Sequence, residues 1–237
     1  MLLYILRHGD PDYETDSLTP KGSLQAQALA KRLAVNGLDK IYSSPLGRAK
    51  QTAQATCDLL GIDMDIEDWT SESLAYRDLS VIHEDGQSRW VFHQERTALI
   101  NDDTISLGDD WGKAQCFRQY DNDFAGGVRR IKDASDAFLA RHGYQREGSI
   151  YRITEPNDER VAVFCHQGFG ITWLSHLLNI PPHIFWAGFD MTHSAITILH
   201  FENYADGFTV PMCLTLSDTS HIYGDGLPLE YNNWLKI

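Results

Sequence analysis

The sequence predicts an α/β fold in which a mostly parallel central sheet has helices on both faces, giving three layers (α/β/α). Two strands are recognisable as continuous apolar runs, Leu2–Leu6 and Val161–Cys165, which are typical of strands covered on both faces. Up to about residue 67, the patterns alternate as strand, helix, strand, helix and strand. This alternation is typical of a parallel sheet with covering helices.

The first helix is expected to begin after Thr19. Thr19-Pro20 combines a good N-cap residue with proline at the first helical position. Apolar residues then recur at helical spacing to about Val35, and Asn36-Gly37 ends the helix. Lys40–Ser43 follows as a short second strand.

Ser44-Pro45 repeats the combination of cap and proline, so the second helix is expected to begin there. Gly61 is the expected residue after its last turn. Apolar and acidic residues alternate from Ile62 to Glu67, which predicts a third strand near an edge of the sheet.

Residues from about 73 to 125 differ in character from the rest of the chain. Charged residues and aromatic residues are frequent there, and both helical and strand periodicity are weak. We expect this stretch to form an insertion or lid within a single domain that spans residues 1–237. Its aromatic and basic residues either select the substrate or serve only as packing and solvated charge.

The second half of the chain predicts further elements of the same kinds. Asp206-Gly207 is typical of a hairpin turn between the last two of them, and the tail from about Ser217 has no readable pattern. The expected elements are a helix over about Val128–Arg141, the strand Val161–Cys165, a helix from His166-Gln167-Gly168 to about Leu178, and strands over Ala195–Phe201 and Phe208–Leu216.

The overall composition excludes several classes of protein. The 237 residues are 43% hydrophobic and 22% charged, which is ordinary for a globular protein and too apolar for a disordered one. The net charge of −13 disfavours nucleic acid and anionic membranes, so neither is expected as a partner. No window approaches the ~20 apolar residues of a membrane span. The four cysteines form no C-x-x-C pair, so we expect reduced thiols and a cytoplasmic location.

Polar side chains follow three of the predicted strands at the point where each strand ends. In an open α/β sheet, ligands bind outside the carboxyl ends of the strands, so these side chains are expected at one edge. Two arginines, two histidines and two helix N-termini then meet there, which favours an anion such as phosphate. The three segments are Arg7-His8-Gly9, Ser43-Ser44-Pro45 with Arg48, and His166-Gln167-Gly168.

This arrangement resembles the histidine phosphatase superfamily, also called the phosphoglycerate-mutase-like family, and in particular its phosphatase branch. The resemblance covers roughly residues 1–72 and 160–201. A single Arg-His-Gly tripeptide occurs by chance, whereas four matching segments in the right order are specific. The matching segments are Leu6–Gly9, Leu18–Gly22 with Gln25-Ala26, Ser43–Ala49 with Gln51–Ala53, and Val163–Gly168.

The resemblance implies a role for each of these polar side chains. His8 is the expected nucleophile, which takes the phosphoryl group on a ring nitrogen and so splits one difficult step into two. Arg7, Arg48 and His166 are expected to hold phosphoryl oxygens and to counter the charge on the transferring group. His8 and Gln167 also belong to the expected phosphate-binding set. No metal and no cofactor are expected, because the arginines supply the positive charge.

The general acid is indicated less directly. Glu72 lies where the resemblance to the phosphatase and mutase branch places a catalytic glutamate, and partial burial is expected to raise its pKa. Glu84 and Asp78 are the alternatives. The acid-phosphatase branch instead has an aspartate directly after the second histidine, where this chain has Gln167, so that branch is disfavoured.

The function that the sequence favours is a metal-independent phosphomonoester hydrolase that acts through phosphohistidine on a small phosphorylated metabolite. Phosphoryl transfer of the phosphoglycerate-mutase type is the first alternative, but Asp10–Tyr13 departs from the mutase motif. A non-catalytic module that binds a phosphorylated ligand and a phosphatase for phosphoproteins are further alternatives. The substrate and the oligomeric state are left open, with a homodimer as one alternative.

Overall fold

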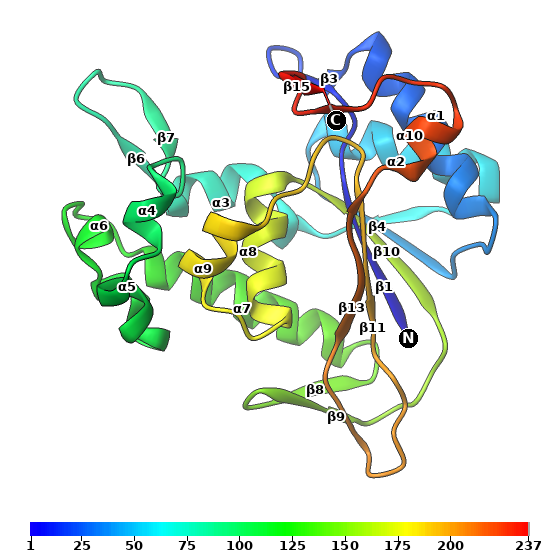
Figure 1. Ribbon diagram of the computed structural model, residues 1–237. Helices are drawn as coiled ribbons and strands as arrows, with labels where there is room; N and C mark the ends of the chain where they lie inside the picture. The colour runs from blue at the N-terminus through cyan, green and yellow to red at the C-terminus, as the bar shows by residue number, and fades with distance from the viewer. Residues whose placement is uncertain (237) are drawn as a thin grey trace.

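Figure 1 shows the computed structural model, which describes residues 1–236. The strands of its central sheet are β1 (Leu2–Arg7), β4 (Lys40–Ser43), β5 (Met64–Ile66), β10 (Arg160–Cys165), β11 (Ile196–His200) and β13 (Met212–Asp218). Their order across the sheet is β13-β11-β1-β10-β4-β5. Four neighbouring strands run parallel to one another: β1, β10, β4 and β5. On the other side of β1, β11 pairs antiparallel with β1, and β13 pairs antiparallel with β11. The predicted α/β fold with a mostly parallel sheet is therefore confirmed.

Helices cover both faces of this sheet (Figure 1). The long ones are α1 (Pro20–Ala34), α2 (Gly47–Leu60), α7 (Phe124–Ala140) and α8 (Gln167–Leu177). Tyr4 and Leu6 of β1 pack in one apolar cluster with α1 and α2. Leu3 and Ile5 pack in a second cluster with α7 and α8. Because successive side chains of a strand point to opposite faces, covering both faces requires the continuous apolar run that the sequence shows.

The first two helices begin in different ways. Thr19 is the N-cap of α1, as predicted, and its hydroxyl oxygen accepts a hydrogen bond from the N–H of Gly22 at 3.0 Å. The predicted start of the second helix at Ser44-Pro45 is wrong, because α2 begins at Gly47. The carboxylate of Asp16 accepts the N–H of Gly47 at 2.6 Å and caps the helix from a distant loop.

The segment from about 73 to 125 folds into short elements that extend the core. Its helices have between four and eight residues, too few for a helical pattern to repeat, which explains the weak periodicity. Trp111 and Phe117 pack against Trp186 of α9 (Pro182–Gly188), with ring centroids 5.4 and 6.3 Å apart respectively. The elements are η1 (Asp68–Thr70), just before the segment, and then α3 (Glu72–Leu79), β6 (Ser80–Ile82), β7 (Ser88–Trp90), α4 (Arg96–Leu99), α5 (Asp102–Ser106), η2 (Gly108–Lys113) and α6 (Gln115–Arg118).

The prediction of one strand over Phe208–Leu216 is wrong. The first two residues of that range form β12 (Phe208–Thr209), which pairs with β9 (Ile150–Ile153) in a separate sheet that also contains β8 (Tyr144–Glu147). Pro211 then interrupts the run, because proline has no N–H to donate to a strand neighbour. Only after it does β13 begin and pair with β11.

The tail after β13 returns to the edge where the parallel strands end. It forms α10 (Ser220–Gly224), which packs on α1, and a hairpin of β14 (Glu230–Tyr231) and β15 (Leu235–Lys236). In Figure 1 this hairpin lies beside the loop with β2 (Pro11–Asp12) and β3 (Ser17–Leu18) that follows β1. Within residues 1–236, no helix has the length and apolar character needed to cross a membrane.

Candidate functional site

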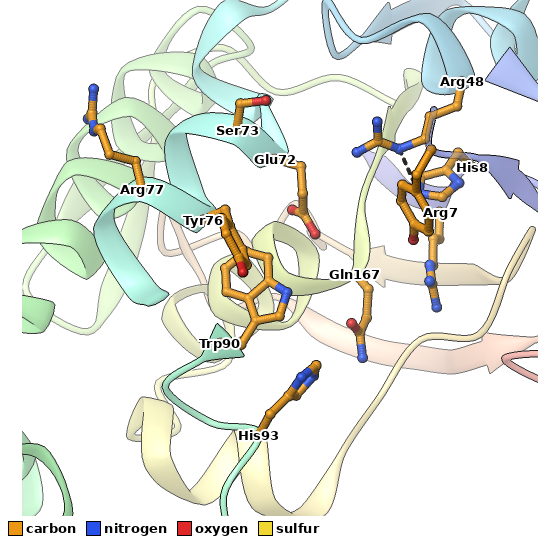
Figure 2. A pocket seen from close by; sticks show the side chains of 11 residues that line it. Arg7, His8, Arg48, Glu72, Ser73, Tyr76, Arg77, Trp90, His93 and Gln167 are labelled. Carbon is orange, nitrogen blue, oxygen red and sulfur yellow. Dashed lines mark hydrogen bonds between the residues drawn. The ribbon is translucent and has the colours of Figure 1, made fainter. Parts of the chain in front are cut away.

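A cavity of about 470 Å³ lies where the parallel strands end (Figure 2). Pockets of this size are typical of small-molecule sites. Five of the six side chains predicted for the site line it, and the sixth, His166, lies behind His8 with the two ring centroids 5.1 Å apart. The lining residues are Arg7, His8, Tyr13, Arg48, Glu72, Ser73, Tyr76, Arg77, Trp90, His93 and Gln167.

His8 follows the last residue of β1 and is held as a neutral imidazole. Its Nδ1 lies 2.7 Å from the carbonyl oxygen of Gly9, which can only accept, so Nδ1 carries the hydrogen. Burial, His166 and Arg7 hold the pKa of His8 well below its usual value. The lone pair is therefore on Nε2, where the Nε–H of Arg48 donates a long hydrogen bond of 3.3 Å (Figure 2).

Two arginines supply positive charge beside this ring. Arg7 is only 4% exposed, and its Nη1 donates to the carbonyl oxygen of Met191 at 2.6 Å and to Oδ1 of Asn232 at 2.5 Å. Arg48 lies in the first turn of α2, and its Nη1 donates to Oδ1 of Asp16 at 2.5 Å. An arginine at a helix N-terminus is unfavourable for the helix dipole, and the Asp16 carboxylate offsets that cost.

His166 is the N-cap residue of α8 and is fully buried. Its Nε2 lies 2.7 Å from the hydroxyl oxygen of Ser44, and its Nδ1 has no partner among residues 1–236. Burial, followed by Arg48 and Arg7, holds its pKa well below the usual value. Because the Ser44 hydroxyl bonds to this histidine, it does not cap α2, which is the physical reason that the predicted helix start is wrong.

Glu72 begins α3 and points its carboxylate at the N-terminus of α8. The carboxylate oxygens accept the N–H groups of Gly168 at 3.0 Å and Phe169 at 2.9 Å. Burial nevertheless raises the pKa of Glu72, against the opposing effect of these two hydrogen bonds and of Arg7 and Arg48. A carboxyl group that is raised in pKa and lies at the cavity wall can act as a proton donor.

The two alternative acids lie outside the cavity. Asp78 forms ion pairs with Arg77 at 2.8 Å and Arg130 at 2.6 Å, which hold its pKa below the usual value against the effect of burial. Glu84 is exposed in the turn between β6 and β7. Of the three candidate acids, only Glu72 is placed to reach a ligand in the cavity. Within the described part of the chain, no cluster of His, Cys, Asp and Glu side chains is arranged to hold a metal ion.

Several neighbours of the site were not predicted. His193 precedes β11, and its ring centroid lies 5.8 Å from that of His8. The sequence could have indicated His193, because it lies just before a predicted strand. The N-terminal end of an antiparallel strand lies at the same edge of the sheet as the carboxyl ends of its parallel neighbours. No such signal exists for Asn232, which reaches Arg7 from the far end of the chain.

A comparison with models of protein families identifies the family of the N-terminal part of the chain. The model of the histidine phosphatase superfamily (branch 1) matches residues 3–87. This segment belongs to the histidine phosphatase superfamily. The resemblance inferred from the strand-end motifs is thus confirmed over the range that contains Arg7, His8, Arg48 and Glu72.

Two curated proteins are similar to part of this chain. A putative phosphoserine phosphatase 2 of Hydrogenobacter thermophilus is 35% identical over 75 residues, which are 28% of this chain and 37% of that protein. A probable phosphoglycerate mutase of Enterobacter sp. is 37% identical over 71 residues, 26% of this chain and 33% of that protein. The matched segment spans about a third of the length of these relatives.

Solved structures share the fold over nearly the whole chain. Phosphoserine phosphatase from Entamoeba histolytica, in complex with 3-phosphoglyceric acid, aligns with a TM-score of 0.61 at 19% identity and covers 93% of this chain and 98% of that one. A mycobacterial glucosyl-3-phosphoglycerate phosphatase aligns with a TM-score of 0.59 at 19% identity, and the alignment covers 92% of this chain and 99% of that one. These alignments show that the shared fold extends beyond the segment that the family model matches.

The buried histidines of this edge make stability dependent on pH. Burial lowers the pKa of His193 to about 3 and that of His221 to about 4, and the pKa values of His8 and His166 are lowered as well. Below the unfolded pKa of about 6.5, the unfolded chain binds protons that the folded chain does not. The free energy of unfolding should therefore fall as the pH falls from 6 to 5, by at least about 2 kcal/mol.

Urea unfolding at a series of pH values measures how the free energy of unfolding depends on pH. His221→Gln should make this dependence weaker, because it removes one histidine whose pKa is lowered in the folded protein. A free energy of unfolding that stays constant between pH 7 and pH 5 would contradict the prediction.

Proposed function

We propose that this protein is a metal-independent phosphomonoester hydrolase that forms a phosphohistidine at His8 and acts on a small phosphorylated metabolite. The observation that carries the proposal is the state of His8: neutral, with Nδ1 bonded to the carbonyl oxygen of Gly9 and the Nε2 lone pair beside Arg48. A neutral imidazole with a fixed tautomer is a ready nucleophile, because no proton has to leave before it attacks.

In the first half of the reaction, the lone pair of His8 Nε2 attacks phosphorus. A nitrogen–phosphorus bond forms, and the bond from phosphorus to the ester oxygen breaks. The ester oxygen leaves with that electron pair and takes a proton from Glu72, whose pKa is raised by burial. The dephosphorylated alcohol is the first product.

In the second half, the Glu72 carboxylate takes a proton from a water molecule as the water oxygen attacks phosphorus. The nitrogen–phosphorus bond breaks, and its electron pair returns to His8 Nε2. Inorganic phosphate leaves, and both side chains recover their starting protonation states. One carboxyl group thus serves as acid and then as base.

Three groups are available for the phosphoryl oxygens. Arg7 has a buried Nε without a partner in the described chain, and Arg48 releases its long bond to His8 when a phosphoryl oxygen offers a better acceptor. His166 bonds to the Ser44 hydroxyl through Nε2, and in the tautomer that carries the hydrogen on Nδ1 this second nitrogen is a donor. N–H donors and positive charge around the transferring group counter the negative charge that develops there, which is the largest contribution that such sites make to phosphoryl transfer.

The rest of the cavity supports a small substrate. Tyr76, Trp90 and His93 come from the segment of residues 73–125 and form the wall opposite His8 (Figure 2). Tyr76 and Trp90 meet edge to face, with ring centroids 4.9 Å apart. We propose that this segment selects the substrate by contacts with the part that lies beyond the phosphoryl group.

The experiment that tests the function is trapping of the phosphoenzyme during turnover. The protein is mixed, in the presence of a chelator, with an aryl phosphate and with a panel that contains phosphoserine, phosphoglycerates and sugar phosphates. It is then quenched in alkali, in which phosphohistidine survives and an acyl phosphate does not. We expect phosphate release together with a phosphorylated peptide that contains His8.

Addition of an acceptor alcohol distinguishes hydrolysis from transfer. A hydrolase passes the phosphoryl group mainly to water, whereas a mutase passes it mainly to the acceptor. Turnover without any phosphoenzyme, or a phosphoryl group on another residue, would contradict the mechanism. A folded protein that binds phosphate but releases none from the panel would indicate a mutase or a binding module.

A further inference from the structure

The C-terminal hairpin presents two asparagine side chains to the site. Asn232 and Asn233 are the first two residues of the three-residue loop between β14 and β15, and their φ angles are 48° and 68°. Two central turn residues with positive φ match the twist of a hairpin, and asparagine tolerates that conformation better than other residues with a Cβ. The N–H of Trp234 closes the turn on the carbonyl oxygen of Tyr231 at 3.2 Å.

Asn232 contacts Arg7 directly. Its Oδ1 accepts from Arg7 Nη1 at 2.5 Å, and the carbonyl oxygen of Met191 accepts from the same nitrogen at 2.6 Å. These two acceptors use both hydrogens of Nη1. Because the guanidinium is planar, fixing Nη1 fixes the whole plane. The buried Nε, which has no partner among the described residues, is then left for a ligand.

The turn is anchored on both sides of this contact. Asn233 donates from Nδ2 to Oδ1 of Asp10 and accepts at Oδ1 from Lys21 Nζ at 2.7 Å. Lys21 also forms an ion pair with Glu230 at 2.5 Å. The backbone N–H of Asn232 donates to the hydroxyl oxygen of Thr192 at 3.0 Å. The position of the Asn232 amide is therefore set by several independent contacts.

We propose that Asn232 is a positioning residue for phosphate binding, which acts by holding the guanidinium of Arg7 in the orientation that receives the phosphoryl group. Asn232 is not among the residues that line the cavity, so its effect passes through Arg7. The inference rests on the proposed function, because it takes the phosphate-binding role of Arg7 from there. It adds that the phosphate site is complete only when the hairpin of β14 and β15 is folded onto it.

Asn232→Gly is the sharpest test, because glycine adopts positive φ without strain and the change removes only the side-chain amide. We expect the Kd for inorganic phosphate, measured by calorimetry, and the KM for an aryl phosphate to rise, and kcat/KM to fall about tenfold to a hundredfold. Lys236→Ala, at an exposed position in the same hairpin, is the matched control and should leave all three unchanged. A thermal midpoint close to that of the unaltered protein shows that the hairpin is retained.

A double-mutant cycle with Arg7→Met separates positioning from a general structural role. If Asn232 acts through Arg7, Asn232→Gly should change the Kd for phosphate less than twofold in the Arg7→Met protein. An equal loss in both backgrounds, or a change of less than twofold in the unaltered background, overturns the inference. Phosphate binding that depends on Asn232 without any phosphate release overturns only the proposed function, and no binding of phosphate overturns both.

Discussion

His8→Ala should lower kcat/KM for an aryl phosphate by at least about 10⁴-fold, because it removes the group that forms the covalent intermediate. The neighbouring donors Arg7, Arg48 and His166 remain, so the affinity for inorganic phosphate should change much less than the rate. The measurement is phosphate release beside phosphate binding by calorimetry. Loss of turnover with retained binding assigns a chemical role to His8 rather than a role in folding.

His176→Asn is the matched control for His8→Ala. His176 is a mostly buried histidine of α8, paired with Asp136 at 2.7 Å and outside the cavity. This variant removes a buried imidazole without touching the proposed nucleophile, so its kcat/KM should stay within about twofold of that of the unaltered protein. Retention of more than about one hundredth of the activity by His8→Ala would place the nucleophile elsewhere.

Glu72→Gln should show an effect that depends on the leaving group. An alkyl oxygen needs a proton to leave, so kcat/KM for an alkyl phosphate should fall about 10²- to 10⁴-fold. A nitrophenolate leaves without a proton, so kcat/KM for the aryl phosphate should fall less than about tenfold. This ratio is informative because kcat/KM reports the phosphorylation step, before Glu72 is needed as a base.

The pH dependence gives an independent measure of the same role. The protonated form of Glu72 is the active acid, so kcat/KM for the alkyl phosphate should fall as the pH rises through the raised pKa of this group. The nucleophile must be neutral, and the pKa of His8 is well below its usual value, so loss of activity on the acid side should lie well below pH 6.5. In Glu72→Gln the fall at higher pH should disappear.

Controls separate proton donation from the structural contact that Glu72 makes. Glutamine keeps one acceptor for the N–H groups of Gly168 and Phe169 but turns an amide towards the other, so some loss of stability is expected. Glu84→Gln, at an exposed position, should leave kcat/KM unchanged for both the alkyl and the aryl phosphate. Equal losses for the alkyl and the aryl phosphate would show that Glu72 supports the site without donating the proton.

The residues of the proposed catalytic group could be predicted because each belongs to a local pattern. Arg7, His8 and His166 directly end or follow apolar strands, and the strand order of an α/β sheet places such ends at one edge. Glu72 follows no such strand end, and its expected role comes from the resemblance to the family. Its place at the cavity depends on how α3 packs against the N-terminus of α8, a contact across 96 positions of sequence.

What the sequence could not predict was decided by groups far apart in the chain. The start of α2 depends on Asp16, 31 positions earlier than Gly47, and on the use of Ser44 by His166. The split of β12 from β13 depends on pairing with β9. In each case a local preference was outweighed by a hydrogen bond that only the folded chain makes available.

The α/β class, the apolar strands and the set of histidines and arginines at one edge can be predicted from the amino-acid sequence, because they follow from periodicity and capping within a few residues. The tautomer of His8, the environment of Glu72 and the contact of Asn232 with Arg7 can be learned only from the folded chain. These depend on burial and on acceptors supplied from elsewhere in the chain, in the last case across 225 positions. Solvent exclusion and the direction of a hydrogen bond are properties of the packed chain, and no run of residues encodes them locally.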